Sequence, residues 1–295
     1  KIMKKQSRRD FLRGIAGAGA SAVLAGELRA GEPASGPVRG TDVVSLGETD
    51  LKPTRLGIGT GTLGGRVQRD LGTEGLTRLV RHSLERGIRY IDTADAYDTH
   101  SYLRKALKGI PRDEYFIQTK TPSRDPDAVR ADVERYRREL DTDYLDTVLM
   151  HCMRDGDWPK RMRRVIDVLH DEKKKGHIGA VGVSCHGMAP LKAAADCPGL
   201  DVHLVRINPF QMRMDGPPQK VVAQMQKMCN KDRGVIGMKI FGESGYESRQ
   251  KRLQSLKFVE GLDCVDCYTI GFASTDEVDE ALNLIERASR AQVSA

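Results

Sequence analysis

The sequence lacks features that mark several classes of protein. No uninterrupted apolar run reaches the 18 or so residues of an ordinary membrane span, so we expect no stable span. Six cysteines are spread over 295 residues, and a domain of this size does not need disulfides. Cys264 and Cys267 have CxxC spacing, but they enter an expected strand instead of opening a helix, and no second CxxC or Cys/His pair lies near them. We interpret them as core cysteines and expect no metal site.

Little net charge is left once the N-terminus is set aside. Residues 1–30 hold seven Lys and Arg residues against two acids, and so carry +5 of the formal +7. The rest of the chain, at about +2, gives no electrostatic reason to expect a nucleic-acid partner. A hydrophobic content of 39% and a charged content of 30% are typical of a globular protein with a full apolar core.

The first 30 residues resemble an export signal. A basic segment ending at Arg13 precedes a weakly hydrophobic stretch rich in Gly and Ala. The run Ser7-Arg8-Arg9-Asp10-Phe11-Leu12 closely resembles the twin-arginine signal. The alternative is a basic amphipathic helix of the folded domain, but three glycines within residues 14–19 weaken any helix there. We therefore expect a signal peptide at 1–30, a linker at 31–42, recognition by the twin-arginine export machinery and delivery to the bacterial periplasm.

The remainder of the chain alternates between apolar runs and charged segments of helical period. Residues 43–53, with a turn-rich centre, predict a β-hairpin before the main fold. The expected strands are Arg55–Thr60, Arg89–Ala94, Tyr115–Lys120, Asp146–His151, Ile178–Ser184, Leu204–Asn208, Val235–Ile240 and Tyr268–Phe272. The expected helices are Gly75–Arg86, Ser101–Leu107, Pro126–Leu140, Pro159–Lys175, Met188–Ala195, Gln219–Lys231, Ser248–Gly261 and Thr275–Ala288.

Eight strand–helix pairs in this length predict an α/β fold, a (β/α)8 TIM barrel spanning residues 43–295 with the hairpin at its N-terminal end. An open, doubly wound sheet is the rival architecture. However, Gly57-Ile58-Gly59-Thr60-Gly61 lacks the GxGxxG spacing followed directly by a helix that such a sheet uses to bind a dinucleotide.

Three neighbouring strands are expected to end in ionisable residues, Asp92, Lys120 and His151, and Tyr97 follows Asp92 in its loop. Barrel active sites gather at this end of the strands. A phenol has a pKa of about 10, but a buried lysine kept charged by Asp92 would lower the pKa of Tyr97. His151 could hydrogen-bond the same substrate oxygen. The cluster predicts a general acid aimed at a carbonyl oxygen during reduction, and, since no residue here supplies electrons, a hydride-carrying cofactor.

The motifs around these residues resemble the aldo/keto reductase superfamily over about residues 44–288. They are Ile91-Asp92-Thr93-Ala94-Asp95-Ala96-Tyr97, Phe116-Ile117-Gln118-Thr119-Lys120 and Asp143-Tyr144-Leu145-Asp146-Thr147-Val148-Leu149-Met150-His151. The resemblance implies reduction of an aldehyde or ketone to an alcohol, or the reverse, with NAD or NADP. It implies Tyr97 as proton donor, Lys120 and Asp92 as the pair that sets its pKa, and His151 at the substrate carbonyl.

The same resemblance implies a set of cofactor-binding residues: Gly59, Thr60, Ser184, Cys185, Asn208, Met238, Phe241, Gly242 and Ser274. Some depart from the family's pattern, because Cys185 replaces an Asn, Asn208-Pro209 replaces Asn-Gln, and Met238 replaces an aromatic ring. Glu277 lies where an arginine often grips the 2′-phosphate, which weakens the case for NADPH over NADH. The choice between NADP and NAD stays open.

One other function remains as an alternative, and a second is discounted. The altered cofactor contacts fit a non-catalytic nucleotide-binding module with a regulatory or sensor role, although the complete set of four catalytic residues argues against it. A sugar enzyme would need two acids facing one gap, whereas Asp92 has Lys120 and His151 as its evident partners. Substrate choice is expected to depend on the loops Arg154–Trp158 and Gln211–Pro218, with Trp158 either lining the pocket or anchoring the next helix.

Overall fold

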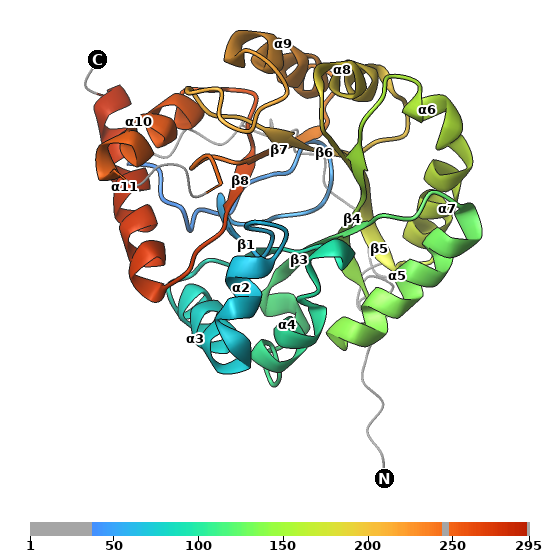
Figure 1. Ribbon diagram of the computed structural model, residues 1–295, viewed down its shortest axis with the longest axis horizontal. Coiled ribbons are helices and arrows are strands. Elements are labelled where there is room, and N and C mark those ends of the chain that lie inside the picture. The colour runs from blue at the N-terminus through green and yellow to red at the C-terminus, as the bar shows by residue number, and fades with distance from the viewer. Residues whose placement is uncertain (1–36, 244–247, 294–295) are drawn as a thin grey trace, which may run out of the picture. The chain divides into compact units, whose positions relative to one another are not determined.

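The computed structural model describes residues 37–243 and 248–293, so the predicted export signal lies outside the described residues. Eight parallel strands pair in chain order, and β1 (Leu56–Gly59) pairs both with β2 (Tyr90–Asp92) and with β8 (Cys267–Ile270), which closes the barrel. Figure 1 shows the helices arranged as a ring outside the strands. The predicted TIM barrel is confirmed.

The remaining strands are β3 (Phe116–Thr121), β4 (Leu145–Met153), β5 (Ile178–Cys185), β6 (Val202–Arg206) and β7 (Gly234–Met238). The helices are α2 (Arg66–Asp70), α3 (Gly72–Glu85), α4 (His100–Ala106), α5 (Pro126–Leu140), α6 (Trp158–Arg161), α7 (Arg163–Lys174), α8 (Met188–Asp196), α9 (Pro218–Cys229), α10 (Arg249–Glu260) and α11 (Thr275–Val293). Two 3₁₀ turns are η1 (Asp95–Tyr97) and η2 (Arg112–Glu114). Within the two described ranges, no helix combines the length and apolar character that crossing a membrane requires.

Local sequence explains why the helix α5 begins and ends where the sequence predicts. The Asp125 side chain accepts hydrogen bonds from the backbone N–H groups of Asp127 (3.0 Å) and Ala128 (3.1 Å), which the first turn would otherwise leave unpaired. Pro126 occupies the first turn, where its missing N–H costs nothing. The helix stops at Asp141, whose backbone is left-handed.

Two differences from the predicted helices have local causes. The segment predicted as one helix, Pro159–Lys175, is divided into α6 and α7 at Met162, whose φ of −90° and ψ of 7° interrupt the helical path. The helix α2 was not predicted, because five residues are too few to show a helical period. It follows Gly64 and Gly65, which both have positive φ.

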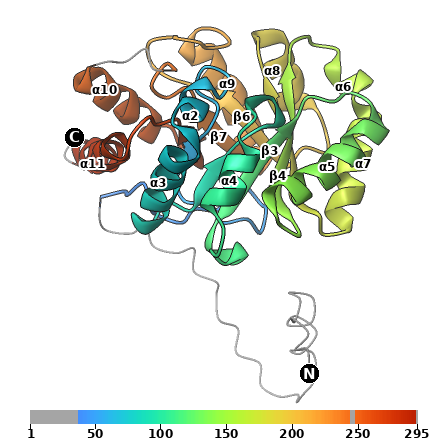
Figure 2. The same ribbon diagram turned by 60° about the horizontal axis from the view of Figure 1, so that its bottom comes forward.

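The segment before β1 covers the N-terminal end of the barrel. Its two arms are joined by one antiparallel bridge between Val43 and Thr54 and by a hydrogen bond from Leu46 N to Leu51 O (3.3 Å), so the predicted hairpin takes the form of a loosely paired loop. Leu46 is fully buried among the inward-facing side chains of the strands. A Cβ on Gly234, the first residue of β7, would lie 2.7 Å from the Leu46 side chain, so Leu46 can pack here only because residue 234 has no side chain. Figure 2 shows the barrel from a second direction.

Candidate active site

A buried ion pair joins the C-terminal ends of β2 and β3. Lys120 Nζ lies 2.7 Å from Asp92 Oδ1 and donates a second hydrogen bond to Thr93 O at 2.7 Å. The side chain of Gln118 donates to the same carboxylate oxygen at 2.8 Å. Burial lowers the pKa of Lys120, but Asp92 and Tyr97 together raise it by more, and the net pKa is raised. The lysine therefore stays charged inside the barrel.

Tyr97 lies over this ion pair. The turn η1 places its ring with the centroid 4.8 Å from Lys120 Nζ, and the His151 ring meets it edge-on with 5.5 Å between centroids. The structure thus brings together the four residues predicted as catalytic. Burial raises the pKa of Tyr97 and the Lys120 ammonium lowers it, with the net pKa above the usual value. The expected effect of the lysine is present, but burial outweighs it, so the phenol holds its proton at neutral pH.

His151, beside the phenol, is a neutral side chain at neutral pH. Burial, followed by the charges of Lys120 and other cations, lowers its pKa to about 3. A neutral imidazole can donate one hydrogen bond and accept another, whereas an imidazolium can only donate. At neutral pH His151 can therefore orient a carbonyl oxygen without adding a positive charge.

A cavity of about 830 Å³ opens beside these residues. Tyr97, Lys120 and His151 line it, together with the predicted cofactor residues Ser184 and Met238. The expected loop Arg154–Trp158 contributes Arg154, Asp155 and Trp158 to the wall. Trp158 lines the cavity and also anchors the start of α6, because its Nε1 donates a hydrogen bond to Pro190 O at 3.1 Å.

The other expected substrate loop, Gln211–Pro218, contributes no side chain to this wall among the residues that the structure describes. Its Asp215 instead forms an ion pair with Arg206 of β6 and accepts a hydrogen bond from Gly187 N at 2.5 Å. The loop therefore braces neighbouring segments.

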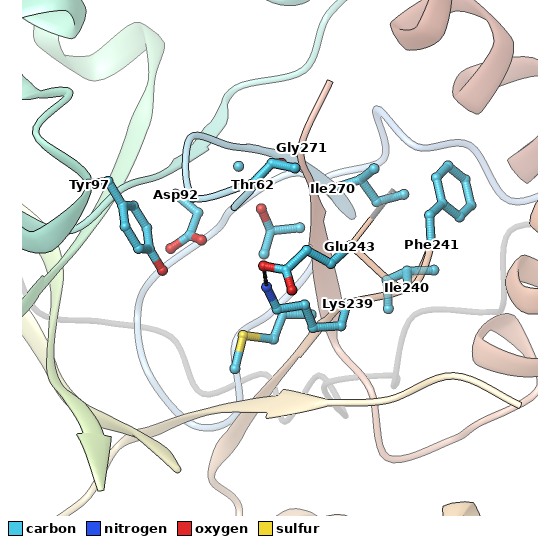
Figure 3. A pocket seen from close by; sticks show the side chains of 13 residues that line it. Thr62, Asp92, Tyr97, Lys239, Ile240, Phe241, Glu243, Ile270 and Gly271 are labelled. Atoms are coloured by element: carbon cyan, nitrogen blue, oxygen red, sulfur yellow. Dashed lines mark hydrogen bonds and ion pairs between the residues drawn. The ribbon is translucent and has the colours of Figure 1, made fainter. Parts of the chain in front are cut away.

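A smaller pocket of about 70 Å³ lies next to the cavity, at the ends of β1, β7 and β8. Three predicted cofactor residues line it: Gly59, Met238 and Phe241. Figure 3 shows Asp92 and Tyr97 at one side of it, Phe241 at the other, and the ion pair of Lys239 with Glu243 between them. Tyr97 and Met238 border both spaces, so the smaller pocket and the larger cavity meet at the phenol.

Features of this pocket fit one part of a nicotinamide nucleotide, since about 70 Å³ is too small for the whole molecule. Thr269 Oγ1 is buried there with no hydrogen-bond partner among the described residues, and a ligand donor or acceptor would satisfy it. A Cβ on Gly61 would lie 2.5 Å from the Tyr97 ring, and one on Gly271 would lie 1.9 Å from Thr62 Oγ1. These glycines let the Tyr97 ring and the Thr62 side chain pack directly against the backbone at the pocket wall. Gly59, Met238 and Phe241 would hold the nucleotide here.

Other predicted cofactor residues do not line either space. Asn208 Nδ2 donates to Met212 O (2.8 Å) and Lys239 O (3.0 Å), so its amide supports its own loop. Cys185 is buried, and its Sγ donates to Pro190 O at 3.4 Å. Both side chains are therefore engaged in the protein's own structure.

Three more predicted cofactor residues also lie outside the two linings. Thr60 is buried and hydrogen-bonds Asp92 O and Thr99 Oγ1. Gly242 directly follows Phe241 and has a φ of 61°. Ser274 Oγ accepts a hydrogen bond from Glu277 N at 3.3 Å at the start of α11. Ser184, which does line the larger cavity, accepts a hydrogen bond from Cys152 N at 2.9 Å.

Sequence reasoning missed several residues that the structure places at the site. Gln118 could have been found, because it shares the inward face of β3 with Lys120 at a spacing of two. Thr62, Thr269 and Glu243 belong to segments that only tertiary structure brings to the pocket. Arg124, in the loop after β3, also lines the larger cavity and gave no motif in the sequence.

The aldo/keto reductase family model matches residues 55–288. The chain belongs to this family. Aldo/keto reductases are NAD(P)-dependent oxidoreductases that act on carbonyl groups, so the cofactor expected from the sequence is that of the family; the preference between NAD and NADP stays open.

Similar proteins include reductases from several organisms. Methylglyoxal reductase DkgB of Salmonella typhi is 28% identical over 138 residues, which are 44% of this chain and 51% of that protein. The NADH-specific methylglyoxal reductase of Escherichia coli (strain K12) is 25% identical over 166 residues, 48% of this chain and 51% of that protein. The chain spans about half the length of these curated relatives. An aldo-keto reductase of Pseudomonas aeruginosa has a TM-score of 0.70 and 22% identity, covering 83% of this chain and 94% of that one, and shows the shared fold.

Proposed function

We propose that this protein reduces the carbonyl group of an aldehyde or ketone to an alcohol, or catalyses the reverse reaction, with Tyr97 as general acid and base. The observation that carries the proposal is the position of the Tyr97 phenol, against a buried charged lysine and beside a neutral histidine, at the edge of a substrate-sized cavity. When bound, the nicotinamide nucleotide supplies or accepts the hydride.

The chain's own residues handle the proton. In reduction, the Tyr97 hydroxyl gives its proton to the carbonyl oxygen as negative charge develops there. Lys120 then stabilises the phenolate that is left, and Asp92 keeps Lys120 charged although it is buried. The neutral His151 donates a hydrogen bond that orients the same oxygen. Water entering the open cavity returns the proton to Tyr97, which completes the cycle.

Replacement of the phenol tests this proposal. Oxidation of NADH and of NADPH by the purified chain is measured with a panel of aldehydes that includes methylglyoxal and butanal. Tyr97→Phe removes only the hydroxyl, and we expect it to lower kcat by about 10²- to 10⁴-fold while nucleotide binding persists. Tyr102→Phe, on the helix α4 away from both cavities, is the matched control and should keep full activity. Equal turnover by wild type and Tyr97→Phe would refute the role of Tyr97.

The nucleotide-binding regulatory or sensor module is the second candidate. It is favoured by Asn208 and Cys185, whose polar atoms bond the protein instead of facing the pocket. Under this alternative, fluorescence titration would show nucleotide binding to wild type, while both wild type and Tyr97→Phe would fail to reduce any aldehyde in the panel.

We also propose that residues 1–30 direct export by the twin-arginine route to the bacterial periplasm. Support comes from the Arg8-Arg9 pair and the weakly hydrophobic stretch after it. Because this route carries folded proteins, the nucleotide would travel already bound. Cell fractionation of a chain with Arg8→Lys and Arg9→Lys should find it retained in the cytoplasm, and mass analysis of the exported wild type should find the nucleotide. Unchanged export of the double variant would contradict the proposal.

A further inference from the structure

The larger cavity carries more positive than negative charge. Its lining includes the cations Lys120, Arg124, Arg154, Arg161 and Lys239 and the carboxylates Asp155 and Glu243. Three of the cations are paired with acids: Lys120 with Asp92, Arg161 with Asp155, and Lys239 with Glu243. Arg124 and Arg154 have no carboxylate within ion-pair distance in residues 37–243 and 248–293. The excess charge is therefore concentrated on these two guanidinium groups.

Hydrogen bonds hold both groups at the end of β4, where His151 lies. Arg124 Nη1 donates to Pro122 O at 2.7 Å, and its Nη2 donates to the backbone oxygen of His151 at 2.5 Å. Arg154 Nε donates a hydrogen bond to Cys152 Sγ at 3.4 Å, which leaves the two Nη groups of Arg154 for a ligand. Like charges held in one wall repel one another, and an anion between them would relieve that repulsion.

Electrostatic effects in the same region agree with this geometry. After burial, the charge of Arg154 lowers the pKa of Arg124, and the charge of Arg124 contributes to the low pKa of His151. The charge of Arg154 therefore acts on Arg124, and the charge of Arg124 acts on His151, whose ring meets the Tyr97 ring. A planar guanidinium binds carboxylate or phosphate oxygens through paired N–H groups.

Two of the predicted cofactor residues lie in a space that these arginines do not line. Gly59 and Phe241 line the smaller pocket at the ends of β1 and β7, and Arg124 and Arg154 do not line it. Tyr97 stands where the two spaces meet. An anion bound by the arginines would therefore lie across the phenol from the nucleotide, in the space left for the substrate.

We propose that the substrate is a carbonyl compound that also carries an anionic group, a carboxylate or a phosphate, and that Arg124 and Arg154 bind that group while the carbonyl oxygen faces Tyr97. The inference rests on the proposed carbonyl reductase function and names the substrate class of its site. The arginines act by binding and orientation, since the proton transfer belongs to Tyr97.

Paired aldehydes that differ in one charged group test the substrate class. The carboxylate arm compares 4-oxobutanoate with butanal, and the phosphate arm compares glyceraldehyde 3-phosphate with glyceraldehyde. We expect at least one charged member to have a kcat/KM about ten- to a hundredfold above that of its neutral partner, the range that one charged hydrogen bond supplies. Arg124→Gln and Arg154→Gln should each reduce that ratio, mainly by raising KM. Arg124→Lys should restore part of it.

A matched control and a binding measurement keep the result interpretable. Arg138→Gln makes the same charge change on the exposed side of α5 and should leave the ratio unaltered. Equal kcat/KM for charged and neutral members in both arms, or a ratio that neither cavity variant changes, would overturn the inference. Calorimetry with succinate and with inorganic phosphate tests the anion site separately from the proposed reductase function. Binding that Arg154→Gln abolishes would support the anion site even if no aldehyde were reduced, and that outcome would count against the proposed function alone.

Discussion

Arg135 of α5 holds both carboxylate oxygens of Asp95, at 2.8 and 2.9 Å, and so fastens the turn that carries Tyr97 to the outer ring of helices. Arg135 also bonds Asp132 (2.8 Å) and Glu139 (3.0 Å). Asp95, Glu139 and His100 lie close enough together to hold a metal ion, but Arg135 already binds the two carboxylates. The cluster is therefore explained as the anchor of the turn.

Loss of this anchor should weaken catalysis more than substrate binding. In Arg135→Gln the turn would sample positions in which the phenol misses the carbonyl oxygen, so we expect kcat to fall about tenfold or more with little change in KM. Arg135→Lys should restore part of kcat because it keeps one charged contact. Arg137→Gln on the same helix breaks the ion pair with Glu134 and serves as control. A fall in thermal stability with unchanged kcat would show a purely structural role.

The Lys120–Asp92 pair should show strong coupling in stability. Asp92→Asn leaves a buried ammonium without its counter-charge, and Lys120→Met leaves a buried carboxylate. Removing one partner of such a pair typically costs about 3–5 kcal/mol of unfolding free energy. The double variant should lose much less than the sum of the two, as measured by urea denaturation. Lys108→Met, an exposed lysine, should cost almost nothing, and additive losses in the cycle would contradict the coupling.

The pH dependence of reduction should follow the tyrosine and not the histidine. Tyr97 must be protonated to act as an acid, and burial raises its pKa above the usual value of about 10. The pKa of His151 is lowered to about 3, so this group does not titrate near neutrality. We expect kcat/KM for reduction to be flat from about pH 5 to pH 9 and to fall only above the ordinary tyrosine range. A step near pH 6.5 that disappears in His151→Asn would show that His151 works as a cation.

His203 should make the protein sensitive to acid. It is fully buried in β6, both its ring nitrogens lack partners among the described residues, and burial lowers its pKa to about 3. Between pH 6.5 and pH 3 the unfolded chain binds a proton that the folded chain does not. Stability must therefore fall as the pH drops through 6.5, by up to about 1.4 kcal/mol per pH unit for this group.

Urea denaturation of His203→Phe between pH 4 and pH 7 isolates this contribution. The difference in unfolding free energy between variant and wild type should move in the variant's favour as the pH falls. His170→Gln, at a partly exposed histidine on α7, should show the wild-type dependence. A constant difference between His203→Phe and wild type across this range would contradict the prediction.

Glu277 should set part of the cofactor preference. Its carboxylate accepts a hydrogen bond from Ala273 N at 2.7 Å at the start of α11, where the family resemblance implies that the 2′-phosphate of NADP lies. Glu277→Arg replaces repulsion by attraction, so the affinity for NADPH relative to NADH should rise about tenfold or more. Glu74→Arg on α3 makes the same charge change elsewhere. An unchanged ratio of the two dissociation constants would place the 2′-phosphate away from α11.

Local pattern was enough for much of the fold and for the centre of the site. The predicted strand Tyr115–Lys120 put Lys120 near the C-terminal end of β3, and the predicted helix Pro126–Leu140 has the bounds of α5. The ends of parallel barrel strands must share one rim, so the order of Asp92, Lys120 and His151 along the chain already implied that they meet.

The sequence by itself determined the barrel, the grouping of Asp92, Lys120 and His151 with Tyr97 and the chemistry that the four allow, because periodicity and closure are set by short-range rules and by strand order. Tertiary structure alone decided which backbone oxygens the Asn208 amide binds, where the Lys239–Glu243 pair lies at the pocket, and which two arginines line the larger cavity without an acid as partner among the described residues. Those outcomes depend on loops whose paths are set by contacts between segments far apart in the chain, and no local pattern encodes such contacts.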